Sequence, residues 1–458
     1  MKRSDLMINV TNNRYRLGYH LMPAGGWIND PNGFTFFKGY YHLFYQFYPD
    51  AAEWGPMHWG HARSKDLVHW ETLPVALVPG DQEDGCFSGS AIVHDNKLWL
   101  IYTGHHYIDK QNDDFYETQN VAYSEDGIHF VKYQNNPVIA HPPADNTKHF
   151  RDPKVWREND HFNMVVGSQD KNKCGRVLLY RSNDLLSWQF VTALSRALDS
   201  KQEGFMWECP DFFPLNGEDV LLCSPQGLQP VGDRFLNENQ TGYFVGNYDE
   251  LSGEFERNRF VEIDHGHDFY ATQTTLTPDG RRIMVAWLNA WDSSFKEQAD
   301  GWCGAITFPR ELTLIGNKIY QQPVREIKAL RKEQVINKQT TDVTTVKVPN
   351  QSELVLNYGR HRNGELFALE SKDQRFSVVN EHGRIVIHNA QRDERAVIVD
   401  DELLRMHVLL DTSSIEIFIN DGEATFTERV YWDEQPTLRL PGGVNAVGYR
   451  LDAQANLY

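Results

Sequence analysis

A seven-residue pattern, Ser-x-Asp-x-x-x-aromatic, recurs along this chain and limits its possible folds more than any other feature. It occurs at Ser64–Trp70, Ser124–Phe130 and Ser182–Trp188, and its aspartates are 60 and 58 residues apart. A weaker copy lies at Asn247–Leu251. Such regular spacing indicates a structural repeat, and a period of about 60 residues suits a four-stranded propeller blade with long loops.

The residues between the repeats favour an all-β fold. Aromatic residues make up 12% of the 458 residues, and short aromatic or β-branched runs are broken by many of the 33 glycines and 20 prolines. Helical periodicity is rare, whereas this punctuation is typical of strands and turns. Roughly five blades of this length fit before residue 325. A recurrent turn between strands, without any cyclic arrangement, is the alternative interpretation.

The pattern changes after residue 325. The charged segment Arg325–Lys332 predicts a short helical linker, and beyond it the strands alternate cleanly. Glu381–Gly383 is a hairpin turn signal, and the isoleucines of Ile415–Ile419 share one face of a strand. The sequence therefore predicts a β-propeller over residues 1–325, a linker over 326–334 and an antiparallel β-sandwich over 335–458.

Charge and cysteine usage restrict the partners and the compartment. A net charge of −18 disfavours nucleic acid and anionic membrane surfaces as partners. No apolar window reaches the roughly 18–20 residues of a membrane span, and the start lacks the apolar core of a signal peptide. The five cysteines are widely spaced, which fits reduced thiols. We expect a cytoplasmic protein, with a previously removed signal peptide as the alternative; the oligomeric state stays open.

Three short segments place a carboxylate beside proline and aromatic residues. They are Trp27–Gly33 with Asp30, His149–Val155 with Asp152, and Trp207–Phe212 with Glu208. Each alone could be a plain turn with a solvated acid. Their spacings of 122 and 56 residues, however, correspond to about two blades and one blade, so the three carboxylates could converge on a propeller axis. Convergent carboxylates ringed by aromatic faces are what cleavage of a glycosidic bond needs.

With these segments the chain resembles glycoside hydrolase family 32, the β-fructofuranosidases, and within it the bacterial sucrose and sucrose-6-phosphate hydrolases. The motifs that carry the resemblance follow the family's order across nearly the whole chain. They are Trp27–Gly33, Phe87–Ser90, Phe150–Pro153, Trp207–Asp211, Asp268–Ala271 and Ser414–Phe418.

The resemblance implies a five-bladed β-propeller followed by a β-sandwich, and a retaining mechanism without a cofactor. In it, Asp30 is the nucleophile that forms a covalent fructosyl-enzyme, Glu208 is the acid/base, and Asp152 stabilises the transition state. A retaining pair needs carboxyl groups about 5–5.5 Å apart. We also expect the charge of Arg151 to keep Asp152 ionised and to leave Glu208 as the protonated member.

The resemblance further implies a fructose pocket. Its expected residues are Asn29, Gln46, Trp54, Phe87, Ser88, Arg151, Tyr270 and Trp287. Core packing is the alternative for the three aromatic side chains of Trp54, Phe87 and Trp287, and a strand-edge cap is the alternative for Gln46. Cys209 follows the expected acid directly, and we interpret it as a buried thiol that helps to place Glu208.

Metal chemistry is not expected. The histidine pairs His58/His61, His105/His106 and His265/His267 do not match a zinc-site spacing. The sequence thus predicts a retaining hydrolase that acts on sucrose, sucrose 6-phosphate or both. A fructan hydrolase or fructosyltransferase is the first alternative. A non-catalytic sugar-binding propeller is the second, and it would not need all three acids.

A phosphorylated substrate would require a cation at the glucosyl end of the pocket. Three lysines that follow the Asp152 turn are candidates, and each could equally be a solvated surface residue. They are Lys154, Lys171 and Lys173.

Overall fold

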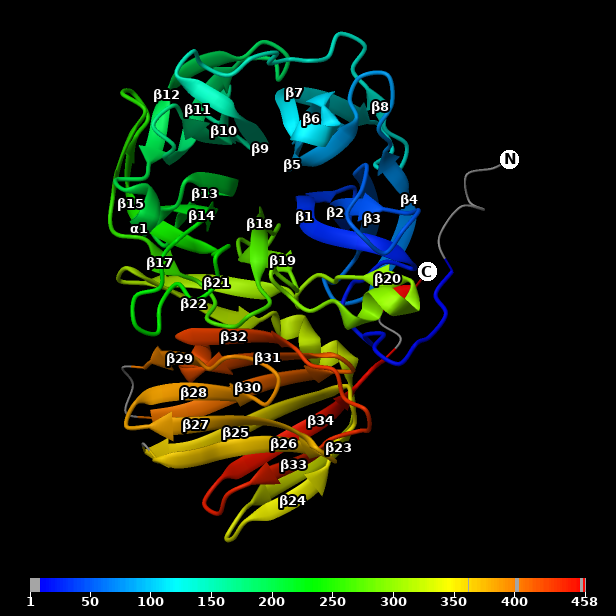
Figure 1. The fold of residues 1–458 in the computed structure, drawn as a ribbon, viewed down its shortest axis with the longest axis vertical. Coiled ribbons are helices and arrows are strands. Elements are labelled where there is room, and N and C mark those ends of the chain that lie inside the picture. The colour runs from blue at the N-terminus through cyan, green and yellow to red at the C-terminus, as the bar shows by residue number, and fades with distance from the viewer. Residues whose placement is uncertain (1–8, 361, 400–402, 454–455, 458) are drawn as a thin grey trace.

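The chain folds into a β-propeller followed by a β-sandwich, as the sequence predicts. The structure is a computed structural model that describes residues 9–360, 362–399, 403–453 and 456–457. In Figure 1 the sheets of the N-terminal part form a ring, and the two sheets of the sandwich stack below it. Among the described residues, no helix combines the length and the apolar character needed to cross a membrane.

The ring contains antiparallel sheets that follow one another along the chain. The first is β1 (Gly26–Phe37), β2 (Tyr40–Tyr48), β3 (His58–Ser64) and β4 (Trp70–Leu77), and the second is β5 (Gly85–His94), β6 (Lys97–Asp109), β7 (Asp114–Ser124) and β8 (Val131–Lys132). The third is β9 (Asn146–Glu158), β10 (His161–Asp170), β11 (Gly175–Ser182) and β12 (Gln189–Arg196). The fourth is β13 (Met206–Leu215), β14 (Glu218–Gln226), β15 (Gly242–Asp249), β16 (Glu254–Arg257) and β17 (Val261–Glu262). The fifth is β18 (Tyr270–Leu276), β19 (Arg282–Trp287), β21 (Arg310–Ile315) and β22 (Lys318–Pro323).

Helical segments between these strands are short. They are η2 (Lys110–Asn112), α1 (Ser200–Glu203), η3 (Lys296–Asp300) and η4 (Arg325–Leu330), with η5 (Asn420–Gly422) in the sandwich. The strands β1, β5, β9, β13 and β18 are the innermost of their sheets, and each contacts its neighbours around the axis. Because β18 also packs against β1, the ring closes on itself.

The repeated sequence pattern forms the same turn in successive sheets. Oδ1 of Asp66 accepts hydrogen bonds from the backbone amides of Val68 and His69, between β3 and β4. Asp126 and Asp184 accept the equivalent pairs between the third and fourth strands of the next two sheets. The two interpretations of the pattern are therefore compatible, since a recurrent Asx turn marks one position of a cyclic architecture.

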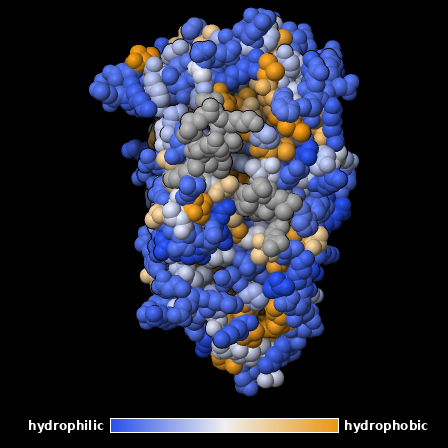
Figure 2. Space-filling model, turned by 90° about the vertical axis from the view of Figure 1, so that its right-hand side faces the viewer, coloured by the Kyte–Doolittle hydropathy of each residue, from blue (hydrophilic) through white to orange (hydrophobic). Residues whose placement is uncertain are grey.

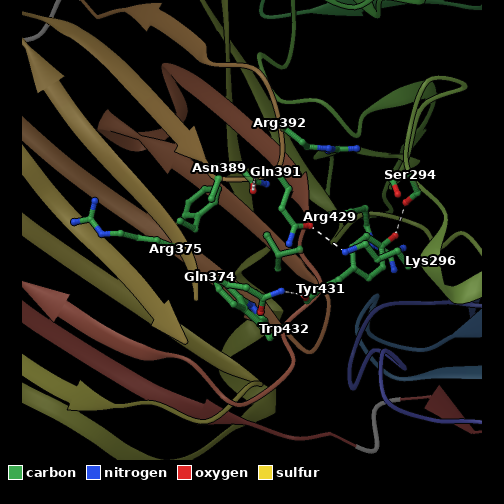
Figure 3. A pocket seen from close by; sticks show the side chains of 13 residues that line it. Ser294, Lys296, Gln374, Arg375, Asn389, Gln391, Arg392, Arg429, Tyr431 and Trp432 are labelled. Carbon is green, nitrogen blue, oxygen red and sulfur yellow. Dashed lines mark hydrogen bonds between the residues drawn. The ribbon is translucent and has the colours of Figure 1, made fainter. Parts of the chain in front are cut away.

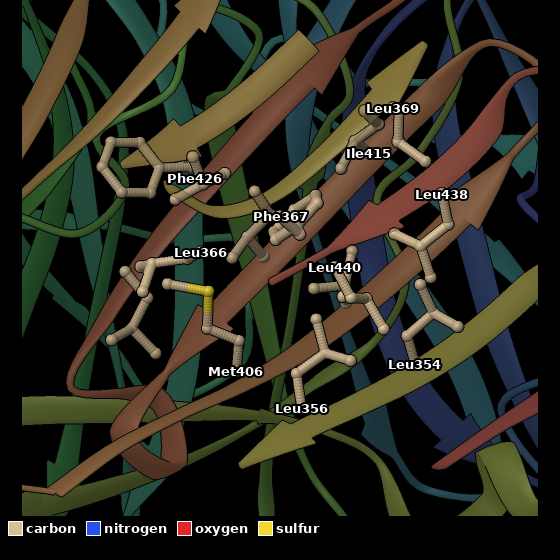
Figure 4. Packing of buried hydrophobic residues seen from close by; sticks show 14 of the residues in the cluster. Leu354, Leu356, Leu366, Phe367, Leu369, Met406, Ile415, Phe426, Leu438 and Leu440 are labelled. Atoms are coloured by element: carbon tan, nitrogen blue, oxygen red, sulfur yellow. The ribbon is translucent and has the colours of Figure 1, made fainter. Parts of the chain in front are cut away.

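The sandwich has one hydrophobic core between two six-stranded sheets (Figure 4). One sheet is β23 (Arg331–Gln339), β34 (Asn445–Leu451), β25 (Ser352–Arg360), β30 (Leu403–Asp411), β31 (Ser414–Ile419) and β32 (Ala424–Arg429). The other is β24 (Thr344–Lys347), β33 (Thr437–Leu440), β26 (Gly364–Ser371), β27 (Gln374–Glu381), β28 (Arg384–Asn389) and β29 (Arg395–Ile398). The isoleucines of β31 all enter this core, and His382 and Gly383 turn β27 into β28 with positive φ, as predicted.

The junction of the two parts is more interwoven than the sequence suggests. The linker is the 3-10 helix η4, and β23 of the sandwich already begins at Arg331. Two short strands complete the first propeller sheet from elsewhere in the chain, because β20 (Trp302–Cys303) pairs with β1 and β35 (Asn456–Leu457) pairs with β4. A strand at the end of the chain thus ties the sandwich back to the ring.

A cavity of about 230 Å³ lies between the two parts (Figure 3). Lys296 of the propeller reaches Gln391 of the sandwich there. Arg392 binds the propeller residue Asp268, and Arg375 pairs with carboxylates of its own sheet. These contacts make the cavity part of the domain interface. The face in Figure 2 is mostly hydrophilic, with apolar residues in separate patches, which agrees with the net charge of −18.

Candidate active site

A cavity of about 250 Å³ at one end of the propeller axis brings together the three carboxylates singled out by the sequence. Asp30 comes from β1, Asp152 from β9 and Glu208 from β13, so three different sheets supply them. The remaining lining residues also come from several sheets. They are Asn29, Gln46, Trp54, Phe87, Ser88, His105, Tyr107, Asp113, Phe115, Glu117, His149, Arg151 and Trp291.

Each innermost strand is irregular at the level of this cavity. The pairing register shifts at Asp30 on β1, Ser88 on β5, Asp152 on β9, Cys209 on β13 and Ala271 on β18. The last three have φ values of 64°, 48° and 53°, which is the left-handed region that side chains rarely adopt. A β-bulge re-aims the neighbouring side chains, so the same distortion on every inner strand directs polar groups toward the axis.

Asp30 is held by donors on both of its oxygens. Ser88 Oγ donates to Oδ2 at 2.6 Å, and the Asn29 side-chain amide donates to Oδ1 at 3.0 Å. Trp27 Nε1 in turn fixes Asn29. Burial, together with the negative charge of Glu208, raises the pKa of Asp30, although the hydrogen bond from Ser88 opposes this shift. These hydrogen bonds therefore fix the orientation of the carboxylate, but they offset only part of the cost of burying its charge.

Glu208 faces Arg151 and Tyr270. The Arg151 guanidinium donates to Glu208 Oε1 from Nε at 3.0 Å and from Nη2 at 2.9 Å, and the Tyr270 hydroxyl donates to Oε2. Arg151 also reaches Glu117 at 3.3 Å and His149 Nδ1 at 2.9 Å. Despite burial, which acts in the opposite direction, Glu117 and Glu208 raise the pKa of Arg151. One guanidinium therefore serves two carboxylates.

The surroundings of Asp152 differ from our expectation. We expected Arg151 to pair with Asp152, but its guanidinium binds Glu208 and Glu117. Burial and the charge of Glu208 raise the pKa of Asp152 well above its ordinary value, and the charge of Arg151 offsets this only in part. The expectation that Arg151 keeps Asp152 ionised is wrong for this arrangement. Adjacent residues of a regular strand point to opposite sides. The bulge at Asp152 lets both Arg151 and Asp152 line the cavity, but the Arg151 guanidinium faces Glu208 and Glu117, not Asp152.

Cys209 is a buried thiol that touches two of the carboxylates. Its backbone amide donates to Asp152 Oδ2 at 2.9 Å, and its Sγ lies 3.6 Å from Asp30 Oδ2 and 3.7 Å from Asp152 Oδ2. Burial and the adjacent Asp152 and Asp30 raise the pKa of the Cys209 thiol, so the thiolate is disfavoured. Its contacts thus place Asp152 and Asp30, whereas the sequence interpretation had it place Glu208.

The expected sugar-binding residues divide into two layers. Asn29, Gln46, Trp54, Phe87, Ser88 and Arg151 line the cavity, together with the carboxylates. Trp54 is 41% exposed at the rim, and the Phe87 ring stacks on His105 with a centroid distance of 4.2 Å. Tyr270 and Trp287 are buried behind the lining; Tyr270 reaches the site only through its hydroxyl. Trp287 packs against Trp27 and Trp291, which fits the core-packing alternative.

Sequence reasoning missed several lining residues on the second sheet. His105 and Tyr107 come from β6, and Phe115 and Glu117 come from β7. Glu117 accepts from the backbone amide of Phe150 at 2.7 Å, and Arg151 and His105 lower its pKa to about 2 against the opposing effect of burial. His105 had been considered only as a metal ligand, and no proline or aromatic motif marks Glu117.

The lysines considered for a phosphate group do not line the cavity. Lys154 is buried further along the axis, where its Nζ binds Asp211 at 2.9 Å and the carbonyl of Thr274 at 2.8 Å. Lys171 and Lys173 are exposed residues of a β10–β11 turn. Lys154 follows the β-bulge at Asp152 and also faces the axis, but one layer deeper than the carboxylates, which the sequence position alone did not reveal.

Potential metal ligands gather elsewhere. Within the described part of the chain, one group of three has ligand atoms within 4.8 Å of one another: Glu158 at the end of β9, His161 at the start of β10, and Glu250 in the β15–β16 turn. None of them lines the axial cavity. The axial cavity instead offers carboxylates, one guanidinium and aromatic faces, a set that suits a sugar.

Comparisons with known proteins agree with this chemistry. Residues 20–323 match the glycosyl hydrolases family 32 N-terminal domain, and residues 336–445 match the family 32 C terminal domain. A sucrose-6-phosphate hydrolase of Zymomonas mobilis is 42% identical over 448 residues, which covers 91% of this chain and 87% of that protein. A raffinose invertase of Escherichia coli is 41% identical over 428 residues, covering 90% and 89%. A Bombyx mori GH32 beta-fructofuranosidase, solved in complex with sucrose, has a TM-score of 0.90 at 40% identity, covering 98% and 96%.

Proposed function

The chain belongs to glycosyl hydrolase family 32 and is a glycoside hydrolase, and we propose that it cleaves the β-fructofuranoside bond of sucrose with retention of configuration. One observation carries this proposal: Asp30, Asp152 and Glu208, from three different sheets, meet in a single cavity walled by aromatic side chains. The sucrose in the similar Bombyx mori structure supports the choice of sugar.

In the proposed first step, Asp30 attacks the anomeric carbon of the fructosyl unit. The bond from that carbon to the bridging oxygen breaks, and Glu208 gives this oxygen its proton, so that glucose leaves. In the second step Glu208 takes a proton from water, and the hydroxide equivalent displaces Asp30 from the fructosyl carbon. Ser88 and Asn29 hold the Asp30 carboxylate for attack.

The charges of the site indicate how the proton reaches Glu208. The Arg151 guanidinium is hydrogen-bonded to Glu208, and burial together with the charge of Glu208 raises the pKa of Asp152 well above its ordinary value. Fructose hydroxyls that donate to Asp152 would favour its ionised form, so that a proton shared among the carboxylates becomes available to Glu208. Substrate binding thereby sets the protonation state that the first step needs, and Asp152 stabilises the positive charge that develops on the sugar ring.

The other lining residues provide shape and orientation. Trp54, Phe87 and Trp291 offer faces or edges on which a sugar can pack, and Gln46 is held by its bond to the Cys86 carbonyl at 3.0 Å. Tyr270 acts on Glu208 from behind the lining. No step of this mechanism requires a metal or a cofactor.

The charge of the cavity supports unphosphorylated sucrose as the preferred substrate. Five carboxylates line it against the single guanidinium of Arg151, which is already shared by two of them. A phosphate dianion would be repelled unless a rim cation met it. Lys148, which lies 4.0 Å from the centroid of Phe115 and pairs with Asp113, is such a cation, and several relatives are sucrose-6-phosphate hydrolases. Sucrose 6-phosphate is therefore the second candidate.

We further infer a five-bladed propeller over residues 1–325 and a sandwich over 335–458, with the expected linker of 326–334 shortened to η4 because β23 already joins the sandwich sheet from Arg331. Support for the blade number comes from the sheets that begin with β1, β5, β9, β13 and β18. We also infer a cytoplasmic location, which the unpaired state of all five cysteines supports.

The proposal is tested with Asp30→Asn, measured by release of glucose and fructose from sucrose. We expect kcat to fall by at least about 10³-fold while the thermal unfolding midpoint changes little, because the substitution is nearly isosteric. Asp113→Asn, a carboxylate at the rim of the same cavity, is the matched control and should keep kcat within a few-fold. Equal activity of Asp30→Asn and wild type would overturn the nucleophile assignment.

The substrate choice is tested by kcat/KM for sucrose and sucrose 6-phosphate, measured side by side at neutral pH. We expect sucrose to be preferred. A tenfold advantage for the phosphorylated sugar, about 1.4 kcal/mol, that disappears in Lys148→Ala would instead establish the second candidate.

A further inference from the structure

Glu117 is a buried carboxylate of the active-site wall to which the proposed mechanism gives no role. It lies on β7, is 2% exposed and lines the catalytic cavity. Burial acts to raise its pKa, but the charge of Arg151 and the contact with His105 lower it to about 2. Glu117 is therefore ionised throughout the pH range in which the protein works, and it cannot exchange the proton that hydrolysis needs. Its contribution has to come from its charge and its position.

The contacts of Glu117 tie it to one end of the Arg151 guanidinium. Arg151 Nη1 lies 3.3 Å from Oε2 and 3.4 Å from Oε1 of Glu117. Oε2 also accepts from the backbone amide of Phe150 at 2.7 Å. Because Phe150 precedes Arg151 on β9, this bond fixes the carboxylate against the strand that carries the arginine. The backbone thus holds Glu117 in place independently of the guanidinium.

The other end of the same guanidinium faces Glu208. Arg151 donates to Glu208 Oε1 from Nε at 3.0 Å and from Nη2 at 2.9 Å. On the Glu117 side, His149 Nδ1 lies 2.9 Å from Nη1, and burial together with the charge of Arg151 lowers the pKa of His149 to about 4. The imidazole is therefore neutral near pH 7, so Glu117 is the charged group that holds this end of Arg151.

A competing partner for Arg151 lies close by. Asp152 is the next residue on β9, and its carboxylate accepts from the Cys209 backbone amide but from no cation of the described chain. Burial and the charge of Glu208 raise the pKa of Asp152, and the charge of Arg151 opposes this shift. A buried carboxylate without a cation attracts any guanidinium that can reach it. An arginine released from Glu117 would therefore turn toward Asp152.

We propose that Glu117 is a positioning residue for the acid/base, because it holds Arg151 on Glu208 and away from Asp152. In this arrangement each oxygen of Glu208 has a donor, Arg151 on Oε1 and the Tyr270 hydroxyl on Oε2. The two donors orient the carboxyl group for delivery of its proton to the bridging oxygen. This inference rests on the proposed function, in which Glu208 gives and takes the proton.

The test is Glu117→Gln, which keeps the size of the side chain and an acceptor for the Phe150 amide but removes the charge. We measure kcat/KM for sucrose and for a β-fructofuranoside with an acidic phenol as its leaving group. The expected loss is about 100-fold on sucrose, since a displacement of about 1 Å at a reacting group costs this much. It should be at least about tenfold smaller on the phenol glycoside, which needs no proton. A crystal structure of the variant should show Arg151 turned toward Asp152.

Glu83→Gln is the matched control. Glu83 is a carboxylate that is 3% exposed, but it neither lines the cavity nor binds Arg151 in the described chain. Any loss in this variant should be equal on the two substrates. A double variant separates positioning from a general structural role. In the Glu208→Gln background, Glu117→Gln should change kcat/KM for sucrose by less than about threefold, because the group that it positions is gone.

A second variant covers the case in which Glu117→Gln does not fold. Glu117→Asp keeps the charge on a shorter side chain, and it should show a smaller loss with the same dependence on the leaving group. Equal losses on the two substrates, no loss on either, or a variant crystal in which Arg151 still binds Glu208 would overturn the inference. The proposed function fails separately, because its failure would appear as a Glu208→Gln variant without any dependence on the leaving group.

Discussion

Two buried clusters of acids in this molecule have opposite electrostatic character. In the active site four carboxylates lie near one guanidinium: Arg151 binds Glu208 and Glu117, and Asp30 and Asp152 have no cation as a hydrogen-bond partner within the described chain. Where the propeller meets the sandwich, three carboxylates share two cations: Asp264, Asp411 and Glu416 with Arg310 and His20. The first cluster is short of positive charge, whereas the second is close to balanced.

The pKa shifts follow this difference. Burial raises the pKa values of Asp30 and Asp152, and their few donors do not compensate. At the interface burial acts the same way, yet His20 and Arg310 outweigh it and lower the pKa values of Asp411 and Glu416. At the domain interface, nearby cations offset the cost of burying the carboxylates. In the catalytic cavity this cost is offset only in part, which keeps the pKa values of Asp30 and Asp152 raised, as is typical of sites where protons move.

The largest effect on stability is expected from removing the interface guanidinium. Arg310 is fully buried and binds Asp264 Oδ2 at 3.0 Å as well as Glu416. Arg310→Met leaves both carboxylates buried without their partner, so urea unfolding should show a loss of about 3–5 kcal/mol. Arg325→Met, which breaks an exposed pair with Asp279, is the control and should cost less than about 1 kcal/mol. Similar small losses for both would break the comparison.

A pH-dependent effect of somewhat smaller size is expected at His20. Burial alone would lower its pKa, but hydrogen bonds to Asp411 and Glu416, both 2.8 Å long, raise it to about 9. Because the folded pKa exceeds the unfolded one, the stabilisation is fully present below about pH 6.5 and is lost as the pH rises through 9. This loss amounts to roughly 3 kcal/mol.

The measurement is urea unfolding at pH 6, 7.5 and 9 for wild type and His20→Gln. Wild type should lose stability across this range, and the variant, which has no titrating group there, should show a flatter profile from a lower starting value. Parallel profiles would mean that His20 does not carry the charge at the interface.

The smallest effect is expected from Tyr270, which acts on the active site from behind its lining. Tyr270→Phe removes one donor from Glu208 and should lower kcat/KM for sucrose about tenfold, or 1.4 kcal/mol. The loss should appear in kcat more than in KM, because the hydroxyl bonds to Glu208 and Tyr270 does not line the cavity. Tyr107→Phe, in the cavity wall, is the control. An unchanged kcat in Tyr270→Phe would show that this hydroxyl does not act on Glu208.

The sequence predicted the propeller and the sandwich because the pattern that indicates each of them lies within a few adjacent residues. The Ser-x-Asp turns recur at the same strand connection, and the isoleucines of β31 alternate with period two, so each follows from a few adjacent residues. The two strands that complete the first sheet could not be predicted from the sequence. The pairings of β20 with β1 and of β35 with β4 join segments hundreds of residues apart, and strands of two residues have no periodicity to detect.

In the site too, local motifs could be predicted from the sequence, whereas contacts between distant segments could not. Asp30, Asp152 and Glu208 were found because each lies in a motif of proline and aromatic residues, and the structure brings them together. The direction of Arg151 was missed, since the bulge at Asp152 changes which neighbour the guanidinium faces. Glu117 was missed because it lies inside an ordinary strand, and only the packing of β7 beside β9 brings it to Arg151.

The central claim is that Glu208 delivers the proton to the leaving group, and one comparison tests it most directly. Glu208→Gln is assayed on sucrose and on a β-fructofuranoside with an acidic phenol as its leaving group. A phenolate leaves without a proton, so kcat/KM should fall at least 100-fold more for sucrose than for the phenol glycoside. An equal loss on both substrates would contradict the account, because it would show that Glu208 contributes something other than the proton.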